Sequence, residues 1–304
     1  MSRKYTVYQI NSFTTTKFTG NPAGVVVDAH GLSDAEMLLI ARELKNSETA
    51  FLFSPHEKTD NYDVEVRFFT PTTEVPICGH ATIAAHFVRV LEQQAQPGQT
   101  LLQKTKAGIL PIEIIASGDA IKIKMTQGKI SFESIDPRHQ SEILNALGIS
   151  EREVNKNCPV EIASTGHSKV MIGINSREKL NRLAPNLTEL KRISSLIKCN
   201  GYFVFTFDSD DANILTHGRM FAPAIGIDED PVTGNANGPL GAYLVKNNLA
   251  NFNGNRFSFT AKQGEAIGRP GTMEVYVDVQ ENIPLKVAIL GEAIPVFKTT
   301  IELE

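Results

Sequence analysis

Residues 67–71 of the chain read RFFTP, and residues 219–223 read RMFAP. Three of the five positions are identical at a shift of 152 residues, half of the 304-residue chain. A repeat with so long a period is sought before any fold is assigned, because it indicates that one structural unit occurs more than once. Two copies predict two lobes of like fold that face each other.

The repeat also aligns polar positions that differ. The same shift pairs Cys78 with Asp230, and each precedes a glycine-containing turn and an apolar helix. It also pairs Glu48 with Asn200, and an apolar segment follows each of them. The two copies agree at the apolar positions that form the framework of each lobe. The polar positions at which they differ are therefore the candidate catalytic positions.

The composition narrows the class of protein. Hydrophobic residues make up 41% and charged residues 21% of the chain, as in soluble globular proteins. The net charge of -4 means that the chain has no excess of basic residues, so we expect no nucleic-acid partner. No apolar run approaches the ~20 residues that a membrane span needs. Three cysteines and the lack of a signal-peptide pattern favour a reducing compartment, and we expect the cytoplasm.

The periodicity of apolar residues predicts the same order of elements in each half. Each half has strands, then an apolar helix, then further strands, which predicts an α+β lobe around one buried helix. In the first half the helices are 33–44 and 80–91, and the strands are 5–13, 25–27, 49–54, 63–69, 101–105, 110–116 and 121–125. In the second half the helices are 187–197 and one that begins at Pro239, and the strands are 170–172, 202–207, 273–279 and 285–289.

The last segment, 293–303, has no counterpart in the repeat, and it is predicted to add a strand to the first lobe. The expected domains are therefore residues 1–117 together with 292–304, and residues 118–291.

The turn before helix 80–91 contains candidate catalytic and ligand-binding residues. Gly79 lets the backbone turn tightly and approach a ligand closely. The helix that follows presents amide N–H groups and a positive dipole end, which suit a carboxylate. Cys78 beside that end is a candidate base with a lowered thiol pKa. The alternative is a buried structural cysteine, with His80 as a helix cap.

The matching segment of the second half, 229–239, holds two glycines and two asparagines before its helix. It is rich in hydrogen-bond donors, although Asp230 and the asparagines are also typical helix caps. Taken alone, Glu48 is interpreted as an ordinary exposed carboxylate at the start of a strand. His86 lies on an apolar helix face and is interpreted as a core histidine. No paired Cys-x-x-Cys and no His-Glu-x-x-His motif occurs, so no metal site is predicted.

Five motifs resemble the phenazine-biosynthesis F-type isomerase family. They are GNPA at 20–23, SETAF at 47–51, FTP at 69–71, CGHAT at 78–82 and DPVTG at 230–234. The resemblance extends over nearly the whole chain in the family's order. It implies the fold of diaminopimelate epimerase, in which two pseudo-symmetric lobes, each a β-barrel around a central helix, hold the active site in the cleft between them. It also implies a cytosolic homodimer that needs no cofactor.

The resemblance further implies roles for individual residues. Glu48 would be the catalytic acid/base, with His80 and Asp230 as its partners in the active site. The expected substrate-binding positions lie in the same motifs: Asn21, Cys78, Gly79, Thr233, Gly234 and Asn235. The implied reaction is a proton transfer within a small carboxylate-bearing substrate.

Two departures from the family's pattern bear on the mechanism. Racemase relatives use two opposed cysteines, whereas Cys78 is aligned here with Asp230, which disfavours a two-thiol racemase. Asn235 stands where phenazine-making members have serine, which weakens the prediction of their namesake substrate. The alternatives are an epimerase that uses Cys78 with a carboxylate as second base, and a binding protein without turnover.

Overall fold

The computed structural model describes residues 2–55, 61–118 and 120–304. The chain forms two compact units, one of residues up to 126 together with 290–304 and one of residues 127–289. The sequence-based division ended the first segment at residue 117. The first unit extends to Thr126 because strand β8 (Ala120–Thr126) pairs antiparallel with β7 (Gly108–Ser117), a strand of that unit.

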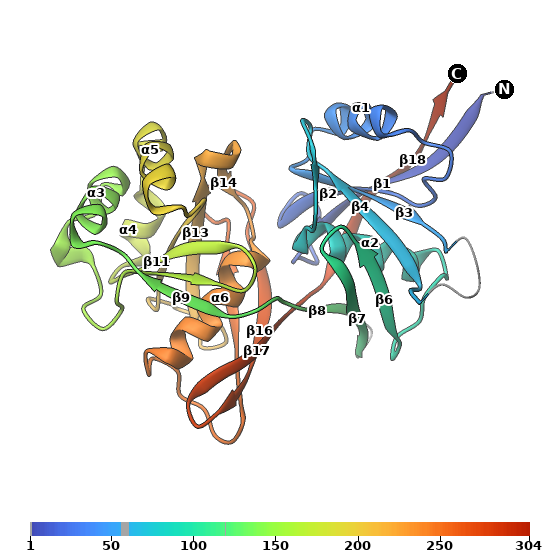
Figure 1. The fold of residues 1–304 in the computed structure, drawn as a ribbon. Coiled ribbons are helices and arrows are strands. Elements are labelled where there is room, and N and C mark those ends of the chain that lie inside the picture. Colours follow the sequence, from blue (N-terminus) through green and yellow to red (C-terminus); the bar gives the residue numbers. More distant parts are fainter. Residues whose placement is uncertain (1, 56–60, 119) are drawn as a thin grey trace. The chain divides into compact units, whose positions relative to one another are not determined.

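The first unit contains β7, β8 and the other elements at the two ends of the chain (Figure 1). The other elements are β1 (Arg3–Ser12), β2 (Asn21–Val26), α1 (Asp34–Leu44), β3 (Glu48–Phe53), β4 (Val64–Phe69), β5 (Glu74–Val75), α2 (Gly79–Leu91), β6 (Thr100–Thr105) and β18 (Ala293–Leu303). The prediction that 293–303 adds a strand here is confirmed, since β18 pairs antiparallel with β1. Figure 1 shows the two strands side by side, β18 in red and β1 in blue.

The second unit contains more helix. Its elements are β9 (Ser131–Ser134), α3 (Pro137–Leu147), η1 (Glu151–Glu153), β10 (Glu161–Ser164), β11 (Ser168–Ile174), α4 (Arg177–Arg182), α5 (Leu187–Ile197), β12 (Tyr202–Thr206), β13 (Thr216–Ala222), η2 (Pro223–Ile225), β14 (Ile227–Asp230), α6 (Gly234–Lys246), β15 (Arg256–Gln263), β16 (Gly271–Gln280) and β17 (Ile283–Gly291). The last two residues of β17 belong to the first unit. The predicted helix 187–197 is confirmed as α5.

The strand pairings of the first unit recur in the second. In the first, β2 pairs antiparallel with β1 and parallel with β3, and β4 pairs antiparallel with β3 and β5 and parallel with β6. In the second, β11 pairs antiparallel with β10 and parallel with β12, and β13 pairs antiparallel with β12 and β14 and parallel with β15. This correspondence identifies equivalent positions without reference to sequence similarity.

One buried helix lies against the strands of each unit. Almost every residue of α2 is buried, and the helix contacts β1, β2, β3, β8 and β18. α6 is buried to the same degree and contacts β10, β11, β15 and β16. Each large apolar side chain that such a helix removes from water contributes about 1.5–3 kcal/mol, so the helix and the surrounding strands stabilise one another. The predicted α+β class, with its buried helices, is confirmed.

The repeated RFFTP and RMFAP segments hold equivalent ion pairs. Arg67 donates to both carboxylate oxygens of Glu74, at 2.9 and 2.7 Å, and Arg219 binds Glu229 at the same two distances. Each guanidinium also lies over the phenylalanine two residues further along its strand. A bidentate pair of this kind fixes geometry as well as adding energy. The matched residues therefore anchor the β4–β5 turn and its counterpart.

The pairings correct the alignment of the polar positions. Val75 and Asp230 occupy equivalent places, opposite Phe68 and Met220 respectively. The shift is therefore 155 residues after this turn, because the second unit carries three extra residues there. Cys78 consequently corresponds to Thr233, the residue before α6, and not to Asp230.

Two further expectations were wrong. The helix of the second half begins at Gly234 and contains Pro239, which sits beyond its first turn. It begins early because the carbonyl of Thr233 accepts both the amide N–H and the side-chain N–H of Asn237. Glu48 does not correspond to Asn200, since the register of β3 and β12 makes Gly201 its counterpart.

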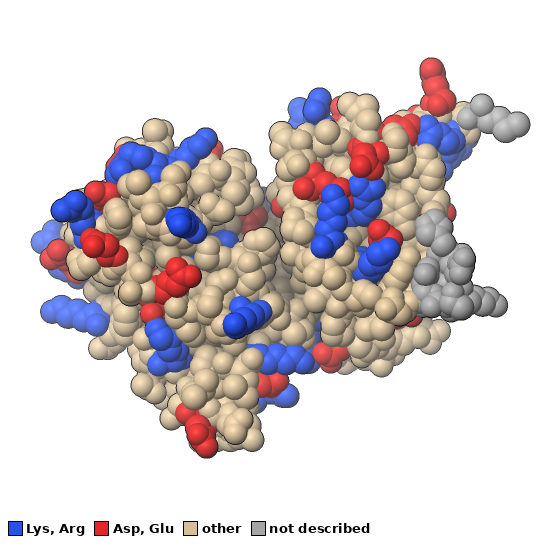
Figure 2. Space-filling view, in the orientation of Figure 1, with Lys and Arg blue, Asp and Glu red and all other residues tan. Residues whose placement is uncertain are grey.

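Acidic and basic side chains alternate over the surface of both units. Figure 2 shows blue and red residues close together on the visible face of each unit. Among the pairs are Arg192 with Glu142 and Glu189, and Arg67 with Asp34. Such exposed pairs each contribute little, about 0–1 kcal/mol. No described helix is long and apolar enough to cross a membrane.

Candidate active site

Glu48, Cys78 and His80 meet at one end of α2 in the first unit. The Glu48 carboxylate lies 3.5 Å from Nε2 of His80, and its side chain is 14% exposed. The hydroxyl of Ser47 lies 3.3 Å from the same nitrogen, and the sulfur of Cys78 lies 3.4 Å from Nδ1. An acid, an imidazole and a thiol are thus in mutual contact, a set of groups able to move protons.

Local structure holds these groups in place. Glu48 is the first residue of β3, beside Ala23 in the parallel ladder with β2. Cys78 precedes α2 with an extended backbone and makes no side-chain capping bond. The Thr82 hydroxyl donates to the Cys78 carbonyl at 2.7 Å, and the Ser12 hydroxyl donates to the His80 carbonyl at 2.7 Å. The first turn of α2 is therefore fixed, while its N-terminal end carries no side-chain cap.

Burial raises the pKa of the Glu48 carboxyl, because the charged form loses hydration. Hydrogen bonds with Ser47 and Cys78 act in the opposite direction and are the smaller influence. A carboxyl with a raised pKa is a better proton acceptor once ionised, and it is a better match to a working pH near neutrality. The sequence alone could not have shown this burial.

A second polar cluster surrounds the N-terminus of α6 in the second unit. The Thr233 hydroxyl donates to the carboxylate of Asp230. Gln263 donates to the Asp230 carbonyl at 2.7 Å, and its side-chain oxygen accepts from the amide of Thr233 at 3.1 Å and from Asn237 at 3.0 Å. Asp230 and Thr233 were predicted site residues, whereas Gln263 and Asn237 were missed. A buried glutamine gives no sequence signal until its partners are known.

The other predicted residues lie beside these two clusters. Gly79 and Gly234 are the first residues of α2 and α6, and Asn235 follows in the first turn of α6. A Cβ at Gly234 would lie 2.4 Å from Cδ1 of Ile289, so a larger residue here would require the Ile289 side chain to move. Asn21 is buried at the start of β2, opposite Ser12.

His86 is a core residue, as its position on an apolar helix face predicted. Its Nε2 lies 2.8 Å from the side-chain oxygen of Gln103. Burial, with Arg89 nearby, lowers the pKa of His86 to about 3, so the ring is neutral at physiological pH. It therefore adds no charge to the cluster at the other end of α2.

The first cluster could also hold a metal ion. The carboxylate of Glu48, the thiol of Cys78 and a ring nitrogen of His80 all lie within 4.8 Å of one another. These are ligand types that zinc accepts. The sequence predicted no metal because its search relied on closely spaced motifs, whereas here one ligand comes from β3 and two from the start of α2.

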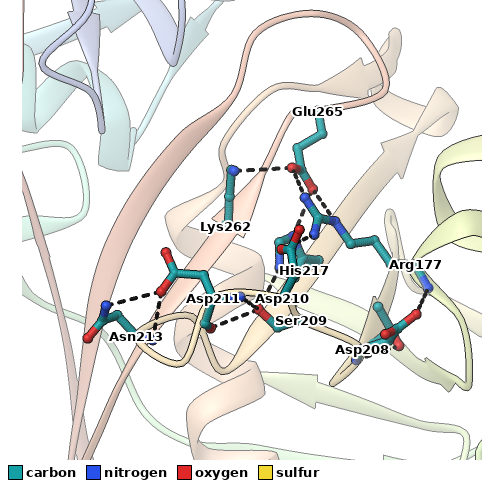
Figure 3. A network of polar contacts seen from close by, with 10 residues as sticks. Arg177, Asp208, Ser209, Asp210, Asp211, Asn213, His217, Lys262 and Glu265 are labelled. Atoms are coloured by element: carbon teal, nitrogen blue, oxygen red, sulfur yellow. Dashed lines mark hydrogen bonds and ion pairs between the residues drawn. The ribbon is translucent and has the colours of Figure 1, made fainter.

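A network of charged residues elsewhere in the second unit has a structural role (Figure 3). Ser209, His217 and Glu265 form a chain in the order of a nucleophile, a base and an acid, with contacts of 3.1 and 2.7 Å. Glu265 is also bound by Arg177 and Lys262. Burial acts to raise the pKa of Glu265, but the hydrogen bonds with His217, Arg177 and Lys262 outweigh burial and lower it. The Ser209 hydroxyl donates to a backbone carbonyl of its own loop. The network thus ties the 208–213 loop to its neighbours.

Comparison with known proteins identifies the family. Residues 10–299 match the family of phenazine biosynthesis-like proteins, PhzC-PhzF. The chain belongs to this family. An uncharacterized isomerase of Clostridium acetobutylicum is 58% identical over the full length of both chains, and the uncharacterized isomerase YddE of Escherichia coli is 46% identical over 96% of each. The family and these relatives establish the protein as an isomerase.

Solved structures agree with the family and the fold. A PhzF-family protein of Bacillus anthracis is 29% identical with a TM-score of 0.88, and the match covers 98% of this chain and 99% of that one. A hydroxyproline epimerase of Agrobacterium vitis has a TM-score of 0.62 over 99% of this chain and 93% of that one. At 10% identity, the epimerase shows only that the fold is shared.

The raised pKa of Glu48 predicts how stability changes with pH. Between the unfolded value near 4.5 and the higher folded value, the native state holds more protons than the unfolded chain, so its stability falls as pH rises. Glu48→Gln removes the titrating carboxyl group and with it this fall in stability. We expect the variant to gain stability relative to wild type as the pH rises above about 4.5, by about 1.4 kcal/mol per unit of pKa difference between the folded and unfolded states.

Urea unfolding at several pH values measures this effect. Glu43→Gln, the same substitution at an exposed position on α1, is the matched control. A Glu48→Gln variant whose stability relative to wild type stays constant with pH would contradict the raised pKa.

Proposed function

We propose that this isomerase moves a proton within a small carboxylate-bearing substrate by general acid–base catalysis, without a cofactor. Glu48 takes a proton from an activated carbon, and the electron pair left behind delocalises into the adjoining unsaturated system. The proton on Glu48 exchanges with solvent, and the protonated carboxyl then delivers a proton to a second carbon. Atoms and charge balance, because the same carboxyl group is deprotonated before and after the reaction. The observation that carries the proposal is the buried, raised-pKa carboxyl in contact with His80.

The neighbouring groups have supporting roles. His80 orients the Glu48 carboxylate, and its ring also contacts Cys78, so one imidazole couples the acid and the thiol. The uncapped start of α2, at Gly79, offers amide N–H groups and a positive dipole end to an anion. Preorganised donors of this kind stabilise charge that develops in a transition state.

The second cluster is proposed to bind the anionic group of a substrate. Thr233 makes no side-chain capping bond to α6, so the first amides of that helix, at Gly234 and Asn235, are available to a ligand. Asp230 is held by Thr233 and Gln263, which fixes its carboxylate for a hydrogen bond to the substrate. Asn21 borders the first cluster through its strand partner Ser12.

A second candidate is an epimerase in which Cys78 is one of two bases. The contact of 3.4 Å between its sulfur and His80 favours this alternative, since a nearby imidazole can take the thiol proton. In that mechanism Glu48 or Asp230 would be the second base. The correspondence of Cys78 with Thr233, a residue that cannot act as a base at neutral pH, argues against a symmetric two-thiol reaction.

Replacement of Glu48 tests the main proposal. Wild-type protein incubated in D₂O with a small-molecule cell extract should introduce one deuterium into its substrate, detected by mass spectrometry. We expect Glu48→Gln to reduce the rate by at least about 100-fold, the usual contribution of a general base. The Glu43→Gln protein should retain the wild-type rate. Full activity of Glu48→Gln would contradict the assignment.

Replacement of Cys78 separates the two candidates. If Glu48 is the acid/base, Cys78→Ala should lose less than about tenfold in rate, because the thiol contributes only to packing and to one hydrogen bond. If Cys78 is a base, the loss should match that of Glu48→Gln, and Cys78→Ser should not restore activity.

Metal removal tests the absence of a cofactor. Because Glu48 must be free to accept a proton, we expect dialysis against a chelator to leave deuterium incorporation unchanged. Added zinc should inhibit, since it would compete for the carboxylate and the thiol. Activity that disappears with the chelator and returns with zinc would show that this cluster is a metal centre.

A further inference from the structure

Lys169 is a buried lysine of the second unit. It lies in β11, and its side chain is among the buried polar groups with 6% relative exposure. Its methylene groups pack against Gly201, where an added Cβ would be only 2.5 Å from Cδ of the lysine. A glycine at 201 is therefore what allows the side chain to lie across β12 at this point.

The ammonium group has few partners for a buried charge. Lys169 donates to the carbonyl of Ser168 at 3.1 Å. In the part of the chain that the structure describes, it makes no ion pair within 4.0 Å. Cys199 and Asp230 are close enough to favour its charged form, but burial outweighs them and lowers the pKa of Lys169.

A buried ammonium group with one carbonyl partner has an unfavourable free energy unless an anion binds to it. Removing an ammonium ion from water costs several kcal/mol even after relaxation, and one carbonyl oxygen offsets only a part of that. A carboxylate placed against Lys169 would gain a charge-assisted hydrogen bond with a group that is already desolvated and fixed. The methylene packing on Gly201 means that the lysine loses little further freedom when it binds.

The ladder positions relate Lys169 to the acid of the first unit. Ala23 in β2 lies beside Glu48 in β3, and the next pair is Gly24 with Thr49. In the second unit the pair equivalent to the latter is Val170 with Tyr202, so the places equivalent to Ala23 and Glu48 hold Lys169 of β11 and Gly201, the residue before β12. One unit thus carries a long anionic side chain next to a small residue, and the other carries a long cationic side chain next to a small residue. The charged residue belongs to the second strand of the pair in the first unit and to the first strand of the pair in the second unit, but the two pairs of residues occupy equivalent places.

We propose that Lys169 binds a carboxylate group of the substrate. This inference rests on the proposed function, in which the substrate carries such a group and Asp230 belongs to the site. Asp230 exerts an electrostatic influence on Lys169, and the Asp230 carboxylate accepts from Thr233 at the start of α6. Lys169 and the first amides of α6 would then discriminate anionic substrates from neutral ones of the same shape.

Benzoate and benzamide test this inference, because they have nearly the same shape and differ in charge. Binding to the full chain is measured by calorimetry for wild type, Lys169→Met and Lys191→Met. Methionine keeps the packing on Gly201 and removes the ammonium, and Lys191 is an exposed lysine on α5. We expect Lys169→Met to weaken benzoate binding by about tenfold to a hundredfold, as for one charge-assisted hydrogen bond. Lys191→Met should have no effect.

Chemical labelling of wild-type protein gives a second measurement that does not depend on folding of the variant. Benzoate should slow the reductive methylation of Lys169 but not that of Lys191, and benzamide should slow neither. Equal benzoate affinity in all three proteins, no preference of wild type for benzoate over benzamide, or no protection of Lys169 would overturn the proposal.

The outcome is separable from that of the proposed function. Deuterium incorporation is compared between wild type and Glu48→Gln, and benzoate binding is compared between wild type and Lys169→Met, so each proposal has its own variant and its own measurement. If Glu48→Gln remains active, the acid–base proposal fails, and the benzoate comparison still decides the role of Lys169. If Glu48→Gln is inactive and Lys169→Met binds benzoate normally, only the inference about Lys169 fails.

Discussion

The burial of one whole helix in each unit is the constraint on which the rest of the structure depends. Because α2 and α6 lie against strands along their length, their first residues begin within the unit rather than at an open surface. In both helices the preceding residue, Cys78 or Thr233, makes no side-chain capping bond. Helix N-termini of this kind attract anions, and the candidate site residues gather around them.

The two units share this framework but not its chemistry. The first unit places a glutamate beside a thiol and an imidazole. The second places an aspartate in a hydrogen-bonded arrangement with Thr233 and Gln263, with a lysine nearby. The acid with the raised pKa has glycine as its counterpart, and the buried lysine has alanine as its counterpart. The two units thus carry different polar groups at equivalent places in the same framework.

Much of this could be predicted from the sequence, for identifiable reasons. The apolar run 80–91 predicted α2 because a helix with few polar breaks must be buried. The CGHAT motif led to Cys78 and His80 through its position at the start of that helix. Glu48 could be selected only through the resemblance to a family, since a single carboxylate at a strand start is ordinary.

The remainder depended on three-dimensional neighbours. Three extra residues before β14 changed the alignment of Cys78 without altering any apolar pattern, so only the strand register reveals them. Gln263 and Lys169 are polar residues whose roles come from burial and from partners far away in the chain. The ligand-type atoms of Glu48, Cys78 and His80 converge from separate segments, which a search for short motifs does not detect.

The central claim is that the fold holds Glu48 as a buried carboxyl with a raised pKa. Titration of protein labelled with ¹³C at the glutamate side-chain carboxyl carbon, followed by NMR, measures this value directly, and the spectrum of Glu48→Gln identifies the resonance. The account predicts a midpoint above the ordinary value of 4.5. A midpoint at or below that value would contradict it.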